Sequence, residues 1–264
     1  MNWLKDTGDA IVRFFDAYSL RARLLPSILG AAPVLAAVLL LISWRTFELS
    51  SIVAVLGGLA LVYALSDWAR KEGKKIEPRI YNEMGGKPSV TIMFRSDDTI
   101  DQLSKDRYRS FLAGKINQPE PTAVDELNNR AAVIGFYELA GTWLRENARE
   151  TKKFPILFNE LVTYGFRRNL LGMKWPALLL NLAVVMLCGG LLWYHWPADN
   201  MMTRIMVVFV VAAAHALYFL LVVDKESVNV AARTYARQLI LSCEAFLTVP
   251  AAKAKDKKGQ SKIK

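Results

Sequence analysis

Residues 175–198 read WPALLLNLAVVMLCGGLLWYHWPA, a run of 24 residues without a charged side chain. As a helix rising 1.5 Å per residue it would extend about 36 Å, enough to cross a hydrocarbon layer of about 30 Å. Three other uncharged runs are of similar character, at residues 24–44, 49–66 and 205–223. The sequence therefore predicts four transmembrane helices.

The spacing of these runs predicts the layout of the chain. Only a few residues separate the first run from the second and the third from the fourth, so each pair forms a hairpin, at residues 24–66 and 175–223. A polar segment of residues 67–174 lies between the hairpins. We therefore expect an α-helical integral membrane protein with four transmembrane helices as two hairpins, and a mainly helical (α+β) domain between them.

The distribution of charge predicts the orientation. The chain of 264 residues has 34 lysines and arginines and a net charge of +10. All but Arg45 and Arg204 fall on one side of the four-span layout, which is the side that faces the cytoplasm. This predicts a multi-pass protein of the bacterial inner membrane with both termini and residues 67–174 in the cytoplasm. Because basic and acidic residues alternate there, the pattern argues against nucleic-acid binding.

Within residues 67–174, local patterns predict one strand and several helices. Residues 84–88 (MGGKP) have the composition of a turn, and residues 89–94 (SVTIMF) are rich in β-branched side chains, as in a strand. Helices are expected at residues 100–113, 122–149 and 155–171. The second of these would begin with a capping box made by Thr122 and Asp125.

The two ends of the chain have different patterns. Residues 1–23 predict an amphipathic helix, which could lie in the headgroup region or pack on the cytoplasmic domain. Residues 224–250 predict a second amphipathic helix. Residues 251–264 include six lysines, which predicts a disordered tail attracted to anionic lipid.

Two short segments are candidates for binding an anionic small molecule. Gly85-Gly86-Lys87 could offer backbone amides and one lysine to an anion, although it lacks the spacing of a P-loop and also fits an ordinary turn. Arg167 and Arg168 lie just before the third apolar run. They fit an interfacial anchor, and alternatively they could bind an anion or a carboxylate of the domain.

The sequence contains no recognisable metal or catalytic signature. Asp97, Asp98 and Asp101 form a D-D-x-x-D pattern, but a helix N-terminus explains it better than a metal. The two cysteines and two histidines are too few and too scattered for a zinc site or a nucleophilic triad. We therefore predict no metal, no cofactor and no enzymatic activity.

Polar and small residues also lie inside the apolar runs. Asn181 and His215 fall at similar depths in the third and fourth runs, so a hydrogen bond between them is expected, with a role in function as the alternative. Gly57-Gly58 and Gly189-Gly190 lie at matching depths in the second and third runs. We expect them to allow close helix packing, with a gating hinge as the alternative.

Several segments resemble a group of uncharacterised bacterial membrane proteins. These are Gly85–Pro88, Phe154-Pro155 with Glu160, and Tyr164–Asn169, and the similarity extends over residues 65–175. In layout alone the chain is also similar to four-span effectors of bacterial antiphage defence. The first resemblance brings no established activity, and the second concerns layout only. From the sequence as a whole we expect a non-enzymatic inner-membrane protein whose cytoplasmic domain senses a ligand or partner and whose spans oligomerise or perturb the bilayer. The alternative is a membrane anchor or scaffold that recruits a soluble partner enzyme.

Overall fold

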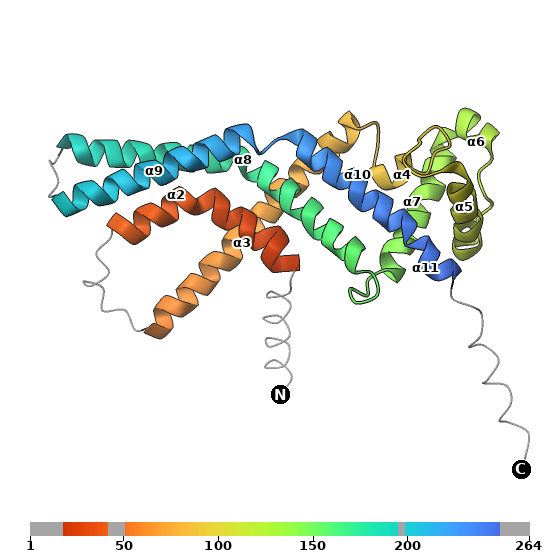
Figure 1. Cartoon of the computed structure of the whole chain (residues 1–264), viewed down its shortest axis with the longest axis horizontal. Coiled ribbons are helices and arrows are strands. Elements are labelled where there is room, and N and C mark those ends of the chain that lie inside the picture. The colour runs from red at the N-terminus through yellow and green to blue at the C-terminus, as the bar shows by residue number, and fades with distance from the viewer. Residues whose placement is uncertain (1–17, 42–50, 195–198, 249–264) are drawn as a thin grey trace, which may run out of the picture. The chain divides into compact units, whose positions relative to one another are not determined.

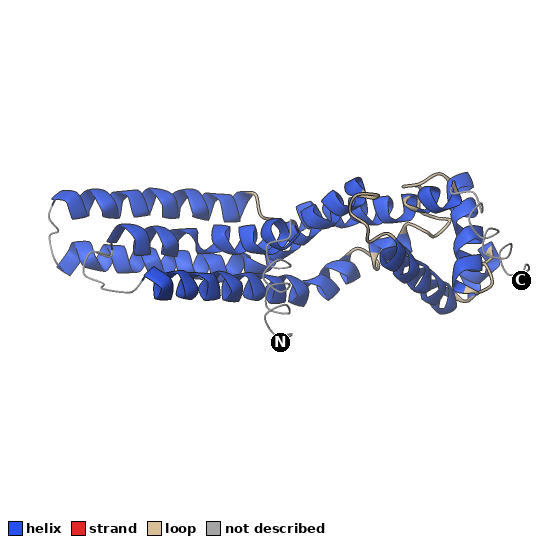
Figure 2. Cartoon of the chain, turned by 90° about the horizontal axis from the view of Figure 1, so that it is seen from below, coloured by secondary structure: helices blue, strands red, loops and turns tan. Residues whose placement is uncertain are grey.

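The structure is a computed structural model that describes residues 18–41, 51–194 and 199–248. Its described residues are mostly helical and include no strand (Figures 1 and 2). They divide into two compact units, one of residues 1–84 with 159–232 and the other of residues 85–158 with 233–264. The predicted domain of residues 67–174 thus differs from the second unit at both ends. The predicted turn at 45–48, most of the N-terminal amphipathic helix and the lysine-rich tail fall outside the described residues.

The first unit contains long, apolar helices. A π-helical turn, η1 (Ser19–Leu24), leads into α2 (Leu25–Leu41), and α3 covers Ser51–Glu83. The helix α8 (Pro155–Tyr194) is 40 residues long and α9 is Asp199–Leu221. In Figure 1, α8 and α9 run side by side, and Asn181 of α8 donates to the carbonyl of Ala212 of α9 at 3.0 Å. A cluster of buried side chains joins α2, α8 and α9: Ala37, Val184, Cys188, Ile205 and Val208.

Three helices of this unit are long and apolar enough to cross a membrane, at Ser19–Leu41, Pro155–Tyr194 and Asn200–Leu221. They correspond to the first, third and fourth predicted spans. The second predicted span, residues 49–66, begins outside the described residues. The length and composition of the described helices therefore support a membrane protein.

The second unit is a small helical domain. It contains α4 (Pro88–Thr91), α5 (Gln102–Ile116), α6 (Ala123–Asn128), α7 (Arg130–Asn147) and α11 (Cys243–Leu247). The first turn of α8 and the second half of α10 (Lys225–Leu241) complete it. Its core is one apolar cluster that includes Tyr108, Leu112, Tyr137, Leu144 and Leu239.

The predicted strand at residues 89–94 is wrong. Pro88 occupies the first turn of α4, and a tight turn follows it. Val90, Ile92, Met93 and Phe94 are all at most 4% exposed, whereas a strand on one face of a core would bury alternate residues. The fold is α-helical in the described residues, and the α+β expectation is not met.

Two buried cations of α5 hold this turn in place. Lys105 donates to the carbonyl oxygens of Phe94, at 2.7 Å, and of Asp97, and Arg109 donates to that of Met93 at 3.2 Å. Burial lowers the pKa of the Lys105 ammonium, against the opposite effect of Asp97. These contacts come from residues far along the chain, so local β propensity could not reveal them.

The predicted helix of residues 122–149 is present but interrupted. Thr122 and Asp125 form the predicted capping box at the start of α6, which confirms that local prediction. Asn129 then leaves the helical conformation, with φ −134° and ψ 51°, and α7 begins at Arg130. Val124 and Leu127 of α6, before this break, are both exposed.

Candidate functional site

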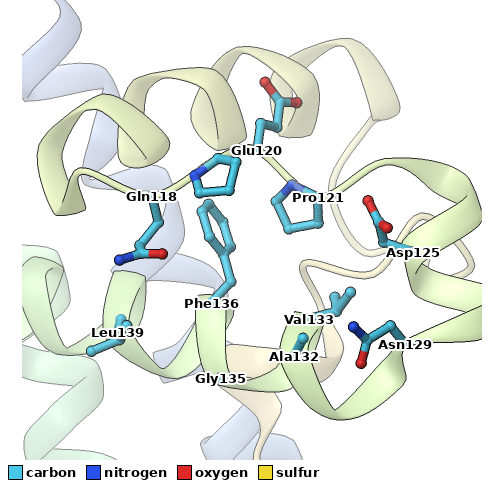
Figure 3. Close-up of a pocket in the computed structure, with 11 residues that line it drawn as sticks. Gln118, Glu120, Pro121, Asp125, Asn129, Ala132, Val133, Gly135, Phe136 and Leu139 are labelled. Carbon is cyan, nitrogen blue, oxygen red and sulfur yellow. The ribbon is translucent and has the colours of Figure 1, made fainter.

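A groove in the second unit is the clearest candidate site (Figure 3). It has a volume of about 450 Å³ and lies between the loop after α5 and one side of α7. Its lining consists of Gln118, Pro119, Glu120, Pro121, Asp125, Asn129, Ala132, Val133, Gly135, Phe136 and Leu139. We call it the α7 groove.

Local sequence builds the loop wall of the α7 groove. Asn117 adopts a left-handed conformation, φ 52°, which ends α5 and turns the chain. Pro119 and Pro121 restrict the next residues, and Thr122 starts α6. Glu120 accepts a hydrogen bond of 2.5 Å from Ser110 of α5. These constraints keep the loop apart from α7 and leave the groove open.

The α7 groove has an apolar floor and polar groups at its edge. Val133, Phe136 and Leu139 of α7 form the floor, and Figure 3 shows the Phe136 ring pointing from α7 toward the loop that carries Pro121. The polar lining side chains are two amides and two carboxylates, with no lysine or arginine among them. Bonds from Thr122 lower the pKa of the Asp125 carboxyl, which keeps it charged. The groove therefore suits an apolar ligand with a positive or hydrogen-bond-donating group.

A second candidate is a polar cluster in the first unit, centred on the Glu77 carboxylate of α3. Its Oε1 accepts hydrogen bonds from Tyr164 at 2.6 Å, from Tyr81 at 3.0 Å and from Arg168 at 3.2 Å. The two tyrosine hydroxyls are also 2.8 Å apart. We call these four residues the Glu77 cluster. It ties α3 to α8 through partly buried polar groups.

The Glu77 cluster shifts acid–base equilibria. Burial alone would raise the pKa of the Glu77 carboxyl, but the bond from Tyr164, the charge of Arg168 and the bond from Tyr81 outweigh it, so the pKa is lowered. Burial raises the pKa of the Tyr81 phenol. The stable state at neutral pH is an ionised carboxylate that accepts from two neutral phenols and one guanidinium. This arrangement stabilises structure and offers no free general base.

The backbones of α3 and α8 come into close contact next to the Glu77 cluster. A Cβ built on Gly172 of α8 would lie 2.5 Å from the backbone of Glu72 and Gly73 of α3. One built on Gly73 would lie 2.8 Å from Cα of Asn169. Asn169 also donates to the carbonyl of Ala22 at 2.7 Å. The contact therefore joins η1, α3 and α8.

The glycines predicted to allow close packing, Gly57-Gly58 and Gly189-Gly190, are not part of this contact. A Cβ at Gly57, Gly189 or Gly190 would meet no described atom within 4 Å, and the surroundings of Gly58 are not described. Within the described part of one chain, the close approach therefore occurs at Gly73 and Gly172 and not at the predicted pairs.

The structure places the two predicted arginines in contact with protein groups. Arg168 pairs with Glu77, which is the carboxylate alternative raised by the sequence. Arg167 donates to the backbone carbonyl of Ser227 at 3.0 Å. Because both guanidinium groups have protein partners, neither contact supports an anion site.

The predicted Gly85-Gly86-Lys87 segment is a turn. Gly85 and Gly86 have φ of 76° and 135°, which favour glycine, and the carbonyl of Lys87 accepts from the amides of Val90 and Thr91. A Cβ on Gly86 would come within 3.0 Å of the Thr91 side chain. This geometry explains the glycines by conformation and close packing, without a ligand.

The predicted partners Asn181 and His215 are both buried in the first unit but do not bond to each other. Asn181 donates to the backbone carbonyl of Ala212, one turn before His215, at 3.0 Å. The His215 imidazole packs on Phe219 with ring centres 4.5 Å apart and lies beside the backbone of Leu29 and Gly30 of α2. The expected side-chain bond is thus replaced by a side-chain-to-backbone bond.

Two of the three aspartates of the D-D-x-x-D pattern, Asp97 and Asp101, have separate roles. Asp97 pairs with Arg233 at 3.0 Å, and Asp101 caps α5 by accepting from the amide of Ser104. Backbone and side-chain bonds from Ser104 lower the pKa of Asp101. Among the described residues no group of three or more acidic, histidine or cysteine side chains could hold a metal ion. The helix-capping interpretation holds for Asp101.

Sequence reasoning missed both the α7 groove and the Glu77 cluster. Glu77 and Tyr81 are four residues apart in a helical segment, which was a visible local signal, but their partners on α8 come more than 80 residues later. In a search for similar proteins, no protein-family model, curated protein or solved structure matches this chain. The resemblances noted from the sequence therefore stay predictions.

Proposed function

We propose that this chain is a non-enzymatic, multi-pass protein of the bacterial inner membrane with both termini in the cytoplasm. Three helices of sufficient length and apolarity support a membrane location. Trp175 and Trp193 of α8 are 69% and 92% exposed. They lie 18 residues apart, or about 27 Å along a helix, as expected of aromatic side chains at the two membrane surfaces.

Cations at helix ends support the same boundaries. Lys174 donates to the carbonyl of Val223, just past the end of α9, at 2.7 Å. Arg204 donates to the carbonyl of Leu40, at the end of α2, at 3.2 Å. Positive groups at helix C-termini are favourable, and here they accompany the transition from apolar to polar sequence.

In this proposal the second unit takes up a ligand or partner, and the membrane helices respond by oligomerising or perturbing the bilayer, as in the defence effectors of similar layout. The observation that carries it is the α7 groove, an apolar recess with an acidic edge. The two units share α8, whose residue Leu157 packs in the core of the second unit. A change in that core can therefore act on a helix that continues into the membrane segment.

Exposed apolar side chains on α6 favour the alternative, a scaffold that recruits a soluble protein. Val124 and Leu127 are 61% and 84% exposed on a six-residue helix with no buried residue. Large exposed apolar groups close together often mark protein-binding surfaces. In this alternative the spans serve only as an anchor.

Filling the α7 groove tests the proposal. Ala132 is exposed and lines the groove, so Ala132→Trp should occupy it without disturbing the core, and Ala131→Trp is a matched control on an exposed neighbour outside the lining. We expect expression of the wild-type chain in bacteria to cause ion leakage, which Ala132→Trp abolishes and Ala131→Trp keeps. Copurification of a soluble protein without leakage would favour the scaffold. If neither leakage nor a copurifying protein is found, both the proposal and the alternative are contradicted.

The topology predicts which positions are accessible from outside the cell. Cysteines introduced at Thr46 and Asn200 should react with a membrane-impermeant thiol reagent in intact cells, because both follow an outward crossing. A cysteine at Gln118, in the loop before α6, should react only after lysis. Reaction of the Gln118 variant in intact cells would overturn the orientation.

A further inference from the structure

Basic side chains gather around one carboxylate where η1 meets α3. Asp67 forms an ion pair with Lys71 at 2.8 Å. The bond from Lys71 is the main cause that lowers the pKa of the Asp67 carboxyl, burial opposes it, and the charges of Arg70 and Arg23 lower it further. Ala22, next to Arg23, and Gly73, three residues after Arg70, both contact Asn169 of α8. Arg23 and Arg70 therefore belong to the region where η1 meets α3.

The positive charge of this group exceeds the negative charge. Asp67 is paired with Lys71. Arg70 makes no hydrogen bond or salt bridge to any residue that the structure describes. Arg23 lies over the Tyr18 ring, with its guanidinium carbon 5.2 Å from the ring centre. Lys74, one turn after Arg70, is exposed. Arg23 and Arg70 thus lie on two helices that meet, and because Asp67 is paired with Lys71, the region has a net positive charge.

The contact at Gly73 and Gly172 gives the depth of these arginines. Because Gly172 touches the backbone at Gly73, the two residues lie at one level of α3 and α8. Arg70 is three residues from that level toward the apolar half of α3, and Trp175 is three residues toward the apolar half of α8, about 4.5 Å in each case. Trp175 is the exposed aromatic residue at the inner membrane surface of our proposal. Arg70 therefore lies at the level of the lipid headgroups. Arg23 follows Ala22, whose carbonyl binds the same Asn169 that contacts Gly73, so it lies near the same level.

We propose that Arg23 and Arg70, flanked by Lys74, bind the phosphate of an anionic phospholipid at the cytoplasmic surface of the membrane. Guanidinium groups suit phosphate oxygens because they offer paired donors in a plane. The adjacent apolar helix surface, where Leu25 and Ile28 of α2 are 45% and 39% exposed, would contact the acyl chains. The inference rests on the membrane location of α2 and α8 and is independent of the α7 groove.

Native mass spectrometry of the detergent-solubilised full chain, titrated with phosphatidylglycerol or phosphatidylethanolamine, tests this site. We expect preferential retention of phosphatidylglycerol, and Arg23→Gln/Arg70→Gln should weaken that binding about twenty- to thirtyfold, from roughly fivefold for each basic residue near a membrane surface. Arg79→Gln/Arg149→Gln removes the same charge from two exposed arginines paired elsewhere and should change it less than threefold.

Three outcomes would overturn the proposal. Equal weakening by both double variants would mean general attraction to positive charge. Equal retention of the two lipids by the wild type would exclude recognition of the anionic headgroup. Displacement of phosphatidylglycerol by millimolar inorganic phosphate would indicate a site for a soluble anion. Thermal unfolding of each variant confirms that any loss of binding is not a loss of fold, and a failed membrane location would appear separately in the cysteine-labelling experiment.

Discussion

Replacing Gly172 with alanine should destabilise the first unit more than any other single methyl addition to its glycines. The new Cβ would lie 2.5 Å from backbone atoms of Glu72 and Gly73, which cannot move aside as the end of a flexible side chain can. Overpacking costs about 1–3 kcal/mol in well-packed proteins, and backbone contact puts this case near the upper value. For a protein of this size that corresponds to a decrease of roughly 6–12 °C in the unfolding midpoint.

The matched control is Gly189→Ala on the same helix. A Cβ there meets no described atom within 4 Å, so the midpoint should change by less than about 2 °C or rise slightly, since alanine favours helix. Thermal unfolding in detergent, followed by circular dichroism, measures both variants. Equal effects at Gly172 and Gly189 would show that α3 and α8 do not approach as closely as the structure indicates.

The features predicted well from sequence depend on neighbouring residues. Apolar runs predicted α2, α8 and α9, because length and hydropathy are local properties. The capping box at Thr122 and the turn at Gly85-Gly86 were also predicted, since each depends on a few adjacent residues. The amphipathic pattern after residue 224 corresponds to α10 and α11.

The failures share a different cause, which is contact between distant residues. The segment 89–94 favours a strand by composition, but Lys105 and Arg109 bind its carbonyl groups in a turn. Gly57 and Gly189 were predicted to pack because they lie at matching depths in the second and third apolar runs. Contact also depends on which face of each helix meets the other, and Gly73 and Gly172 lie on those faces. The α7 groove is lined by Asn129, where the helix breaks, and by a loop more than ten residues away from Leu139, so local patterns did not predict it.

The Glu77 cluster gives the second large expected effect. Glu77→Ala would leave the Arg168 guanidinium, whose side chain is 9% exposed, without its carboxylate, and would remove the acceptor of Tyr164. Breaking a fully buried pair costs about 3–5 kcal/mol. Because a quarter of the Glu77 side chain is exposed, we expect about 2–3 kcal/mol. Glu77→Gln keeps an acceptor for Tyr164 and should lose roughly half as much.

The pH dependence identifies the ionised carboxylate as the source of this stability. The pKa of Glu77 is lowered below the value of 4.5 that it has when unfolded, so its contribution is complete above pH 4.5 and is lost as pH falls through the folded pKa. The difference in unfolding midpoint between wild type and Glu77→Gln should therefore be largest at pH 6 and shrink toward pH 3.5. Glu83→Gln, at an exposed ion pair with Lys225, controls for general acid effects. A gap that stays constant from pH 6 to pH 3.5 would mean that the cluster stabilises α3 and α8 by shape and hydrogen bonding alone, without the charge of Glu77.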